Sequence, residues 1–164
     1  MKLQKATRCA LFAVLELAQD PDRQISAADI ASMYDISANH LAKVLRDLAR
    51  AGLVESMRGA GGGYRFCGNA KRVTLYEVVR IFEDVERGVR PEAGDSSPIG
   101  QALNRVTREI DEIAVATLRS ITLSTLLKLV DRMAAEEPTA RQVMDAVDYR
   151  PGVKQPTSRW REPG

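Results

Sequence analysis

The chain has 164 residues, of which 45% are hydrophobic, 28% charged and 5% aromatic, and its formal net charge is +2. This balance is typical of a soluble globular protein and excludes a wholly disordered or collagen-like chain; the low aromatic content favours helices packed through aliphatic side chains. No apolar run approaches the roughly 20 residues that span a bilayer, and residues 1–9 lack the apolar stretch of a signal peptide, so we expect a cytoplasmic protein without membrane contact.

Basic residues concentrate in the first half of the chain. Lysine and arginine outnumber acidic residues in residues 1–72, most clearly in residues 37–72, whereas acidic residues prevail after residue 72. This asymmetry indicates an anionic partner for the first half, with an ordinary solvated surface as the alternative.

The first three predicted elements are helices. Apolar residues at helical spacing predict a helix over residues 3–19, which ends at the turn signal of residues 20–22. Ser26 and Asp29 have the spacing of a capping box and predict a second, short helix that closes near Met33. Ser37 is expected to cap a third helix, which Gly52 stops. Two short helices joined by a small turn indicate a helix-turn-helix.

The third helix has two contrasting faces. Its apolar positions are Leu41, Val44, Leu45 and Leu48, and the opposite line carries Asn39, Lys43, Arg46 and Arg50. Amide and guanidinium groups match the base edges of the DNA major groove, and ammonium groups pair with phosphates. A merely solvated face is the alternative reading.

A hairpin follows. The runs 53–57 and 64–67 flank Arg58 and a glycine-rich segment, which predicts two strands joined by a turn, and a hairpin after a helix-turn-helix is a wing. A nucleotide-binding phosphate loop is disfavoured because no helix opens after the glycines and no Gly-Lys-Ser/Thr follows.

These segments resemble a known family. Residues 36–41 (ISANHL), 48–53 (LARAGL), 54–64 (VESMRGAGGGY) and 74–79 (TLYEVV) are similar to the Rrf-two family of bacterial winged-helix transcription regulators, over about residues 1–130. The resemblance implies a mainly α fold and a homodimer that binds an operator in double-stranded DNA, with the third helix in the major groove and the wing in the minor groove. It implies DNA contacts from the recognition helix (Ser37, Asn39, His40, Lys43, Arg46), the wing (Arg58, Gly61, Gly62, Arg65) and the start of the first helix (Lys2, Gln4, Lys5, Arg8).

The second half is expected to supply the dimer interface. Thr74 and Glu77 predict a capped short helix, and residues 86–98 a loop. From residue 99 the spacing of apolar residues alternates between four and three, which favours a seam that pairs with another helix, although packing on its own domain is the alternative. The seam residues are Ile99, Leu103, Val106, Ile110 and Ile113. A last short helix is expected to turn Leu123, Leu126, Leu127 and Val130 towards the core. The predicted domains are a winged-helix domain (1–72), a linker helix, loop and dimerisation helices (73–135), and a flexible tail (136–164), in which a weak helix over residues 139–147 is the alternative.

The thiols and the single imidazole limit metal and redox chemistry. The chain has two cysteines, Cys9 and Cys67, and one histidine, His40. A zinc site of Cys and His would need almost all of them, so we expect no metal. Cluster-binding members of the family carry three cysteines in the segment corresponding to residues 88–105, and none is present here, so an iron-sulfur cluster of that type is not expected.

The signal must then arrive as an effector ligand, a partner protein or thiol oxidation. Cys9 is a candidate redox sensor because Lys5 and Arg8 nearby would lower a thiol pKa, with burial in the helix core as the alternative reading. Cys67 is the second candidate redox residue, with an exposed spectator as the preferred reading. No enzyme is expected, because no oxyanion or carboxylate partner accompanies the thiols and His40. The preferred hypothesis is a repressor, and a winged helix that binds a protein instead of DNA is the rival.

Overall fold

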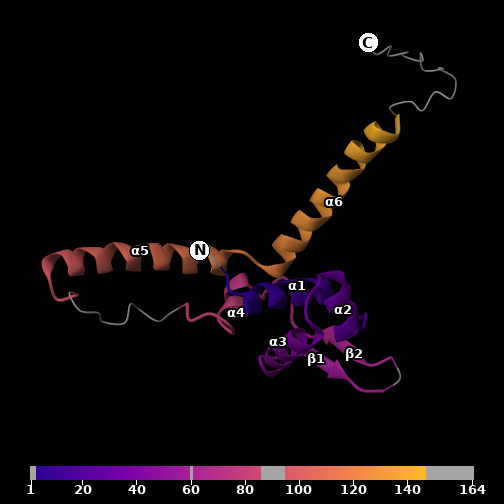
Figure 1. Cartoon of the computed structure of the whole chain (residues 1–164), viewed down its shortest axis with the longest axis horizontal. Coiled ribbons are helices and arrows are strands. Elements are labelled where there is room, and N and C mark those ends of the chain that lie inside the picture. Colours follow the sequence, from indigo (N-terminus) through magenta and orange to yellow (C-terminus); the bar gives the residue numbers. More distant parts are fainter. Residues whose placement is uncertain (1–2, 60, 86–94, 147–164) are drawn as a thin grey trace, which may run out of the picture. The chain divides into compact units, whose positions relative to one another are not determined.

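The computed structural model describes residues 3–59, 61–85 and 95–146, with side chains in the last stretch described up to residue 136 (Figure 1). Its elements are α1 (Lys5–Gln19), α2 (Ala27–Met33), α3 (Ala38–Arg50), β1 (Val54–Met57), β2 (Gly63–Phe66), α4 (Leu75–Val79), α5 (Pro98–Ser120) and α6 (Leu123–Ala146). The fold is mainly helical with one two-stranded sheet, as predicted. The chain divides into two compact units, residues 1–129 and 130–164, and the division falls within α6.

The core of the first unit is built from aliphatic side chains of α1, α2 and α3. The four predicted apolar positions of α3 are all buried, and they pack in one cluster with the buried side chains of α1, among them Ala10, Ala13, Val14 and Leu17. Burying one such leucine or valine side chain contributes about 1.5–3 kcal/mol. The predicted amphipathic pattern of α1 and α3 is therefore confirmed.

Local capping signals set the ends of the short helices. The Ser26 hydroxyl accepts a hydrogen bond from the Asp29 backbone N–H at 3.1 Å and donates one to the Asp29 carboxylate at 2.7 Å. Helix α3 ends where Gly52 adopts a φ of +73°, and the N–H groups of Gly52 and Leu53 return to the carbonyls of Ala49 and Leu48. This pattern is the Schellman motif, in which a left-handed residue satisfies the last carbonyls of a helix.

The hairpin pairs β1 with β2 in antiparallel register, with Val54 opposite Phe66 and Glu55 opposite Arg65. A backbone bridge that the sequence did not predict joins this hairpin to the segment before α2. Ile25 donates its N–H to the Tyr64 carbonyl at 3.0 Å and accepts the Tyr64 N–H at 2.9 Å. A Cβ atom on Gly63 would lie 2.6 Å from the Ile25 carbonyl oxygen, so only glycine fits at this close approach.

Residues 73–129 belong to the same compact unit as the winged helix, which differs from the predicted division at residue 72. Thr74 and Glu77 form the predicted capping box at the start of α4. Backbone bonds then join this segment to the α5–α6 junction, from Leu75 N–H to the Ile121 carbonyl and from Leu123 N–H to the Val73 carbonyl. Because Leu123 is fully buried in the main core, the junction is part of the first unit rather than of a separate domain.

Helix α6 differs from the short helix that was predicted. It has 24 residues and continues through Pro138 to Ala146, so the first part of the predicted tail is helical, whereas residues 147–164 lie outside the described residues. Alanine and arginine on both sides of the proline favour a helical backbone. Leu127 packs against the core as expected, but Val130 is 43% exposed, so its predicted core position is wrong. No helix in the described ranges is both long and apolar enough to cross a bilayer.

Candidate nucleic-acid interface

Helix α3 presents a polar face on the side opposite its buried leucines. Asn39, Lys43 and Arg46 are solvent-exposed there. In the part of the chain that the structure describes, neither Lys43 nor Arg46 forms an ion pair. Their charges are therefore available to an anionic partner, and the Asn39 amide is available to a base edge.

Three other predicted residues of this helix are placed differently. The Arg50 guanidinium lies 3.3 Å from the Asp47 carboxylate, and both groups are exposed, so the pair is weak and its charge is partly compensated. His40 is half-buried, and its Nε2 atom has no hydrogen-bond partner. Ser37 occupies the N-cap position, but its hydroxyl makes no capping bond; the helix end is exposed, where water can satisfy the free amides. Ser37 therefore occupies the predicted N-cap position, but without the side-chain capping bond.

The orientation of α2 is fixed against α1 by contacts that the sequence analysis missed. The rings of Phe12 and Tyr34 stack with their centroids 4.8 Å apart and their planes inclined by 2°. The Tyr34 hydroxyl donates a hydrogen bond to the Glu16 carboxylate at 2.6 Å. Burial, together with this bond and the Glu16 charge, raises the pKa of Tyr34 to about 12. These contacts hold the end of α2 against α1.

The two arginines of the wing are not equivalent. Arg58 is exposed and makes no ion pair within the described residues. Arg65 forms an ion pair with Glu55, its partner in the strand register, and the hydrogen bond and charge of Glu55 raise the pKa of Arg65. An arginine engaged in this way is less available to DNA, which leaves Arg58 as the uncompensated wing cation.

The predicted wing glycines have structural roles that are visible in the loop. Gly61 adopts a φ of +82° and is exposed. A Cβ atom on Gly62 would lie 2.6 Å from the Met57 carbonyl oxygen, and the Gly62 N–H donates to the Gly59 carbonyl at 2.9 Å. The shape of the loop therefore requires glycine at both positions, whether or not the backbone also approaches a phosphate.

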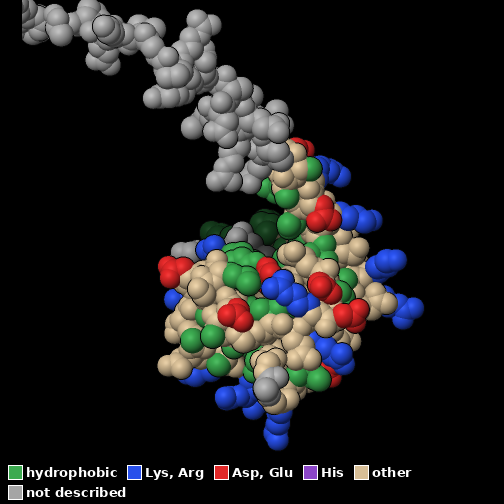
Figure 2. Space-filling view, turned by 90° about the vertical axis from the view of Figure 1, so that its right-hand side faces the viewer, with side chains coloured by type: hydrophobic (Ala, Val, Ile, Leu, Met, Phe, Trp, Pro, Cys, Tyr) green, Lys and Arg blue, Asp and Glu red, His purple; other side chains and the backbone are tan. Residues whose placement is uncertain are grey.

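The start of α1 carries the predicted phosphate contacts. Lys5 and Arg8 are exposed, and the Arg8 guanidinium lies 6.0 Å from the centroid of the Phe12 ring. Gln4 is engaged elsewhere, because its side-chain amide donates to the Glu83 carboxylate at 3.1 Å. Lys2 lies outside the described residues. Figure 2 shows Lys and Arg side chains projecting from the lower edge of the molecule.

The two thiols lie in different environments. Cys9 is 4% exposed and belongs to the main core. Cys67 is exposed and donates a hydrogen bond to the Gly52 carbonyl at 3.2 Å. Burial and the Glu55 charge raise the pKa of the Cys67 thiol against the opposing charge of Arg65. Over residues 3–59, 61–85 and 95–136, no group of three or more His, Cys, Asp or Glu side chains could hold a metal ion.

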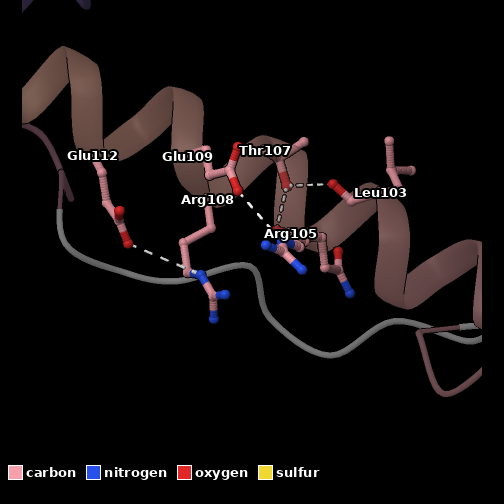
Figure 3. Close-up of polar contacts among 7 residues, drawn as sticks. Leu103, Arg105, Thr107, Arg108, Glu109 and Glu112 are labelled. Atoms are coloured by element: carbon pink, nitrogen blue, oxygen red, sulfur yellow. Dashed lines mark hydrogen bonds and ion pairs between the residues drawn. The ribbon is translucent and has the colours of Figure 1, made fainter.

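The apolar stripe of α5 is solvent-exposed in the chain as described. Its five residues are 54–82% exposed, from Val106 at the lower limit to Ile99 at the upper. Four charged residues of the same helix form two ion pairs, Arg105 with Glu109 and Arg108 with Glu112 (Figure 3). Close to its end the helix packs on α4, where Leu118 is buried against Tyr76 and Val79. Within the residues that the structure describes, the predicted seam is therefore not covered by its own domain.

Comparison with known proteins agrees with this architecture. Residues 3–129 match the Rrf2 family, described as iron-dependent transcriptional regulators. A Rhodopseudomonas palustris protein assigned as an HTH-type transcriptional regulator, BadM, is 59% identical over 131 residues, which are 80% of this chain and 84% of that protein. The HTH-type transcriptional regulator IscR of Cereibacter sphaeroides is 29% identical over 88% of this chain and 99% of its own length.

A solved structure extends the comparison to three dimensions. CymR, the global cysteine regulator of B. subtilis, is 27% identical and superimposes with a TM-score of 0.67 over 79% of this chain and 98% of its own. These relatives are regulators of transcription rather than enzymes. The winged helix-turn-helix, its uncompensated polar face and the family match together show that the chain belongs to the Rrf2 family and is a DNA-binding transcription regulator.

Proposed function

We propose that the chain acts in the cytoplasm as a homodimeric repressor that occupies an operator in double-stranded DNA. The α3 polar face reads bases in the major groove, and the wing enters the minor groove. The observation that carries this proposal is the exposed and unpaired state of Lys43 and Arg46 on a helix whose other face is buried.

Dimerisation is supported by the exposed stripe of α5. Proteins in water seldom expose a continuous line of five aliphatic side chains to solvent. The alternating spacing of four and three residues is typical of a helix that packs against a second helix. A second copy of the chain is a suitable partner, because a twofold axis brings the same surface of two copies together and the apolar stripe of one copy then packs against that of the other. Two α3 helices in one dimer would then meet half-sites one or two turns of DNA apart.

The division of labour within the interface follows from the chemistry of each group. Asn39 and Arg46 offer amide and guanidinium donors for base edges, and Lys43 offers a point charge for phosphate. Arg58 supplies the wing with a cation, and Lys5 and Arg8 supply the start of α1 with two more. Phosphate contacts fix the register of the protein on DNA without reading its sequence. Base-contacting residues should therefore affect the preference for operator over random DNA, and phosphate-contacting residues the affinity for both.

The test is a fluorescence-anisotropy titration of the full-length protein onto its own upstream DNA and onto random duplex. Arg46→Ala is expected to reduce the preference for operator over random DNA by about tenfold to a hundredfold, the worth of one base contact. Arg50→Ala is the comparison on the same helix, because the Arg50 charge is partly compensated by Asp47. It should reduce that preference less than Arg46→Ala does. An unaltered preference in Arg46→Ala would contradict the assignment of the recognition face.

The salt dependence of binding distinguishes DNA binding from the rival function, a winged helix that binds a protein. DNA affinity falls steeply with salt concentration because bound phosphates release counterions, whereas an apolar protein interface responds little. Salt-independent binding, or none to any duplex, would refute the DNA-binding proposal for this surface.

The donor set of the chain does not fit an iron-sulfur cluster of the usual family type. Such clusters use thiolate ligands, and the chain has only two cysteines, one of them in the α1 core and the other beside the wing. We therefore infer that the signal is an effector ligand or a partner protein. The burial of Cys9 supports a packing role rather than a redox sensor. Operator affinity should be equal in thiol-reduced and mildly oxidised protein, and a difference that disappears in Cys9→Ser would restore the redox hypothesis.

A further inference from the structure

The first turn of α1 lacks a cap from its own sequence. Gln4 stands at the N-cap position without a side-chain capping bond, and the first turn contains no acidic residue. The Glu83 carboxylate takes this place from far along the chain. One of its oxygens accepts the Gln4 backbone N–H at 2.7 Å and the Thr7 hydroxyl at 2.6 Å, and the other accepts the Gln4 side-chain amide at 3.1 Å.

This contact is specific rather than incidental. Thr7 is fully buried, so its hydroxyl depends on Glu83 for a partner. Burial opposes the effect, but hydrogen bonds from Thr7 and Gln4 outweigh it and lower the pKa of the Glu83 carboxyl. A negative charge at this point also complements the positive end of the helix dipole.

The same turn is held by an apolar contact. Leu3 packs against the cluster of Tyr76, Val79 and Leu118, which joins α4 to the end of α5. The α1 start is therefore fixed by one polar and one apolar contact to the elements that lead into the proposed dimer helix. Lys5 and Arg8, the proposed phosphate contacts, lie on this turn or immediately after it.

We propose that Glu83 is a positioning residue for phosphate binding: it fixes the first turn of α1 on the α4–α5 side of the unit so that Lys5 and Arg8 meet the DNA backbone. The inference rests on the proposed function, because it needs these two cations to contact DNA. It ties the DNA-binding surface to α4 and α5, which carry the proposed dimer stripe.

The direction in which DNA affinity changes when the Glu83 carboxylate is removed distinguishes a positioning role from a simple effect of its charge. Removing a carboxylate beside basic residues reduces repulsion of DNA and would by itself strengthen binding. Loss of positioning weakens binding instead. Glu83→Gln is expected to weaken binding of the full-length protein to random duplex by about threefold to tenfold and to reduce the salt slope by about one, with the operator preference unchanged.

The controls are built into the same titration. Asp20→Asn removes one carboxylate at the opposite end of α1 and should leave affinity unchanged or slightly stronger. In a Lys5→Ala background, Glu83→Gln should have a smaller effect than in the parent, because residues that act through one another are not additive. Full additivity, or equal or tighter binding by Glu83→Gln, would overturn the inference.

A second pair of variants covers the case in which Glu83→Gln fails to fold. Thr7→Ser keeps the hydroxyl that Glu83 accepts, and Thr7→Val removes it at similar volume. The serine variant should bind random duplex more tightly than the valine variant, and equal binding would contradict the proposal. If the parent protein shows no salt-dependent DNA binding, the proposed function itself fails; if the parent binds and the variants do not differ from it, only the role of Glu83 fails.

Discussion

Helices α3 and α5 have similar amphipathic patterns but opposite environments. In α3 the apolar residues are buried against α1 and β1, so the helix is held by its own chain. In α5 the apolar stripe is exposed, and burial is limited to Leu118 near its end. Periodicity alone therefore shows that a helix needs an apolar partner, but not whether the partner lies in the same chain. The two helices should respond differently to mutation and to protein concentration.

The largest effect is expected on the intramolecular side of this comparison. Leu45→Ala removes a fully buried side chain from the core and should lower the free energy of unfolding by about 2–5 kcal/mol through lost burial and cavity formation. Urea unfolding followed by circular dichroism measures the change. Replacement of the exposed Met33 by alanine is the control and should shift the free energy of unfolding by less than about 0.5 kcal/mol.

The intermolecular side is tested by Ile110→Asp, which places a charge in the α5 stripe. We expect dimer affinity to fall by about a hundredfold or more, because an unpaired charge cannot be buried in an apolar contact. Sedimentation at several protein concentrations measures the dissociation constant. Arg108→Asp introduces the same side chain on the other side of the helix and should leave the dimer intact. Equal behaviour of the two variants would remove the stripe from the interface.

The wing offers a test of intramolecular contacts that are not apolar. Gly63→Ala places a Cβ atom 2.6 Å from the Ile25 carbonyl oxygen, so the bridge between Ile25 and Tyr64 must open. We expect a loss of about 1–3 kcal/mol in the free energy of unfolding, as for other overpacked sites. Thermal unfolding measures it, with the exposed Ser56→Ala as a control on the partner strand. An unchanged melting temperature would show that the bridge does not hold the wing.

The smallest expected effect concerns the Tyr34–Glu16 bond between α1 and α2. Because the folded-state pKa of Tyr34 is raised from 10 to about 12, its contribution is complete below pH 10 and is lost as the pH rises through 12. Solvent screening limits this contribution to under about 1 kcal/mol. In Tyr34→Phe, the stability between pH 10 and 12 should decline less than in the parent. Parallel decline of both proteins would mean that the hydroxyl contributes nothing.

The elements that the sequence predicted correctly are those with local signals. The Ser26–Asp29 cap, the Gly52 stop and the glycine-rich turn each depend on residues within a few positions of one another. The α3 polar face followed from helical spacing in the same way. The pairing of Arg65 with Glu55 was also within reach, because the hairpin register places them opposite each other.

The features that escaped prediction join residues distant in sequence. The Ile25–Tyr64 bridge, the Phe12–Tyr34 stack and the Glu83 cap bring together positions that share no periodic pattern. Contacts of this kind depend on how the folded backbone brings distant segments together rather than on residue spacing. The length of α6 was not predicted for another reason: proline usually ends a helix, but here the helix-favouring residues around Pro138 keep the backbone helical.

The Glu83 cap joins two segments that are far apart in the chain. Its contact with Gln4 spans 79 positions of sequence, so the first turn of α1 cannot gain this cap until the chain has been synthesised through residue 83. A nascent chain that ends before residue 83 contains the recognition helix and the wing but lacks the carboxylate that caps the first turn of α1. We expect this long loop to close late in folding, because a contact between distant residues requires the loss of conformational entropy of the intervening chain.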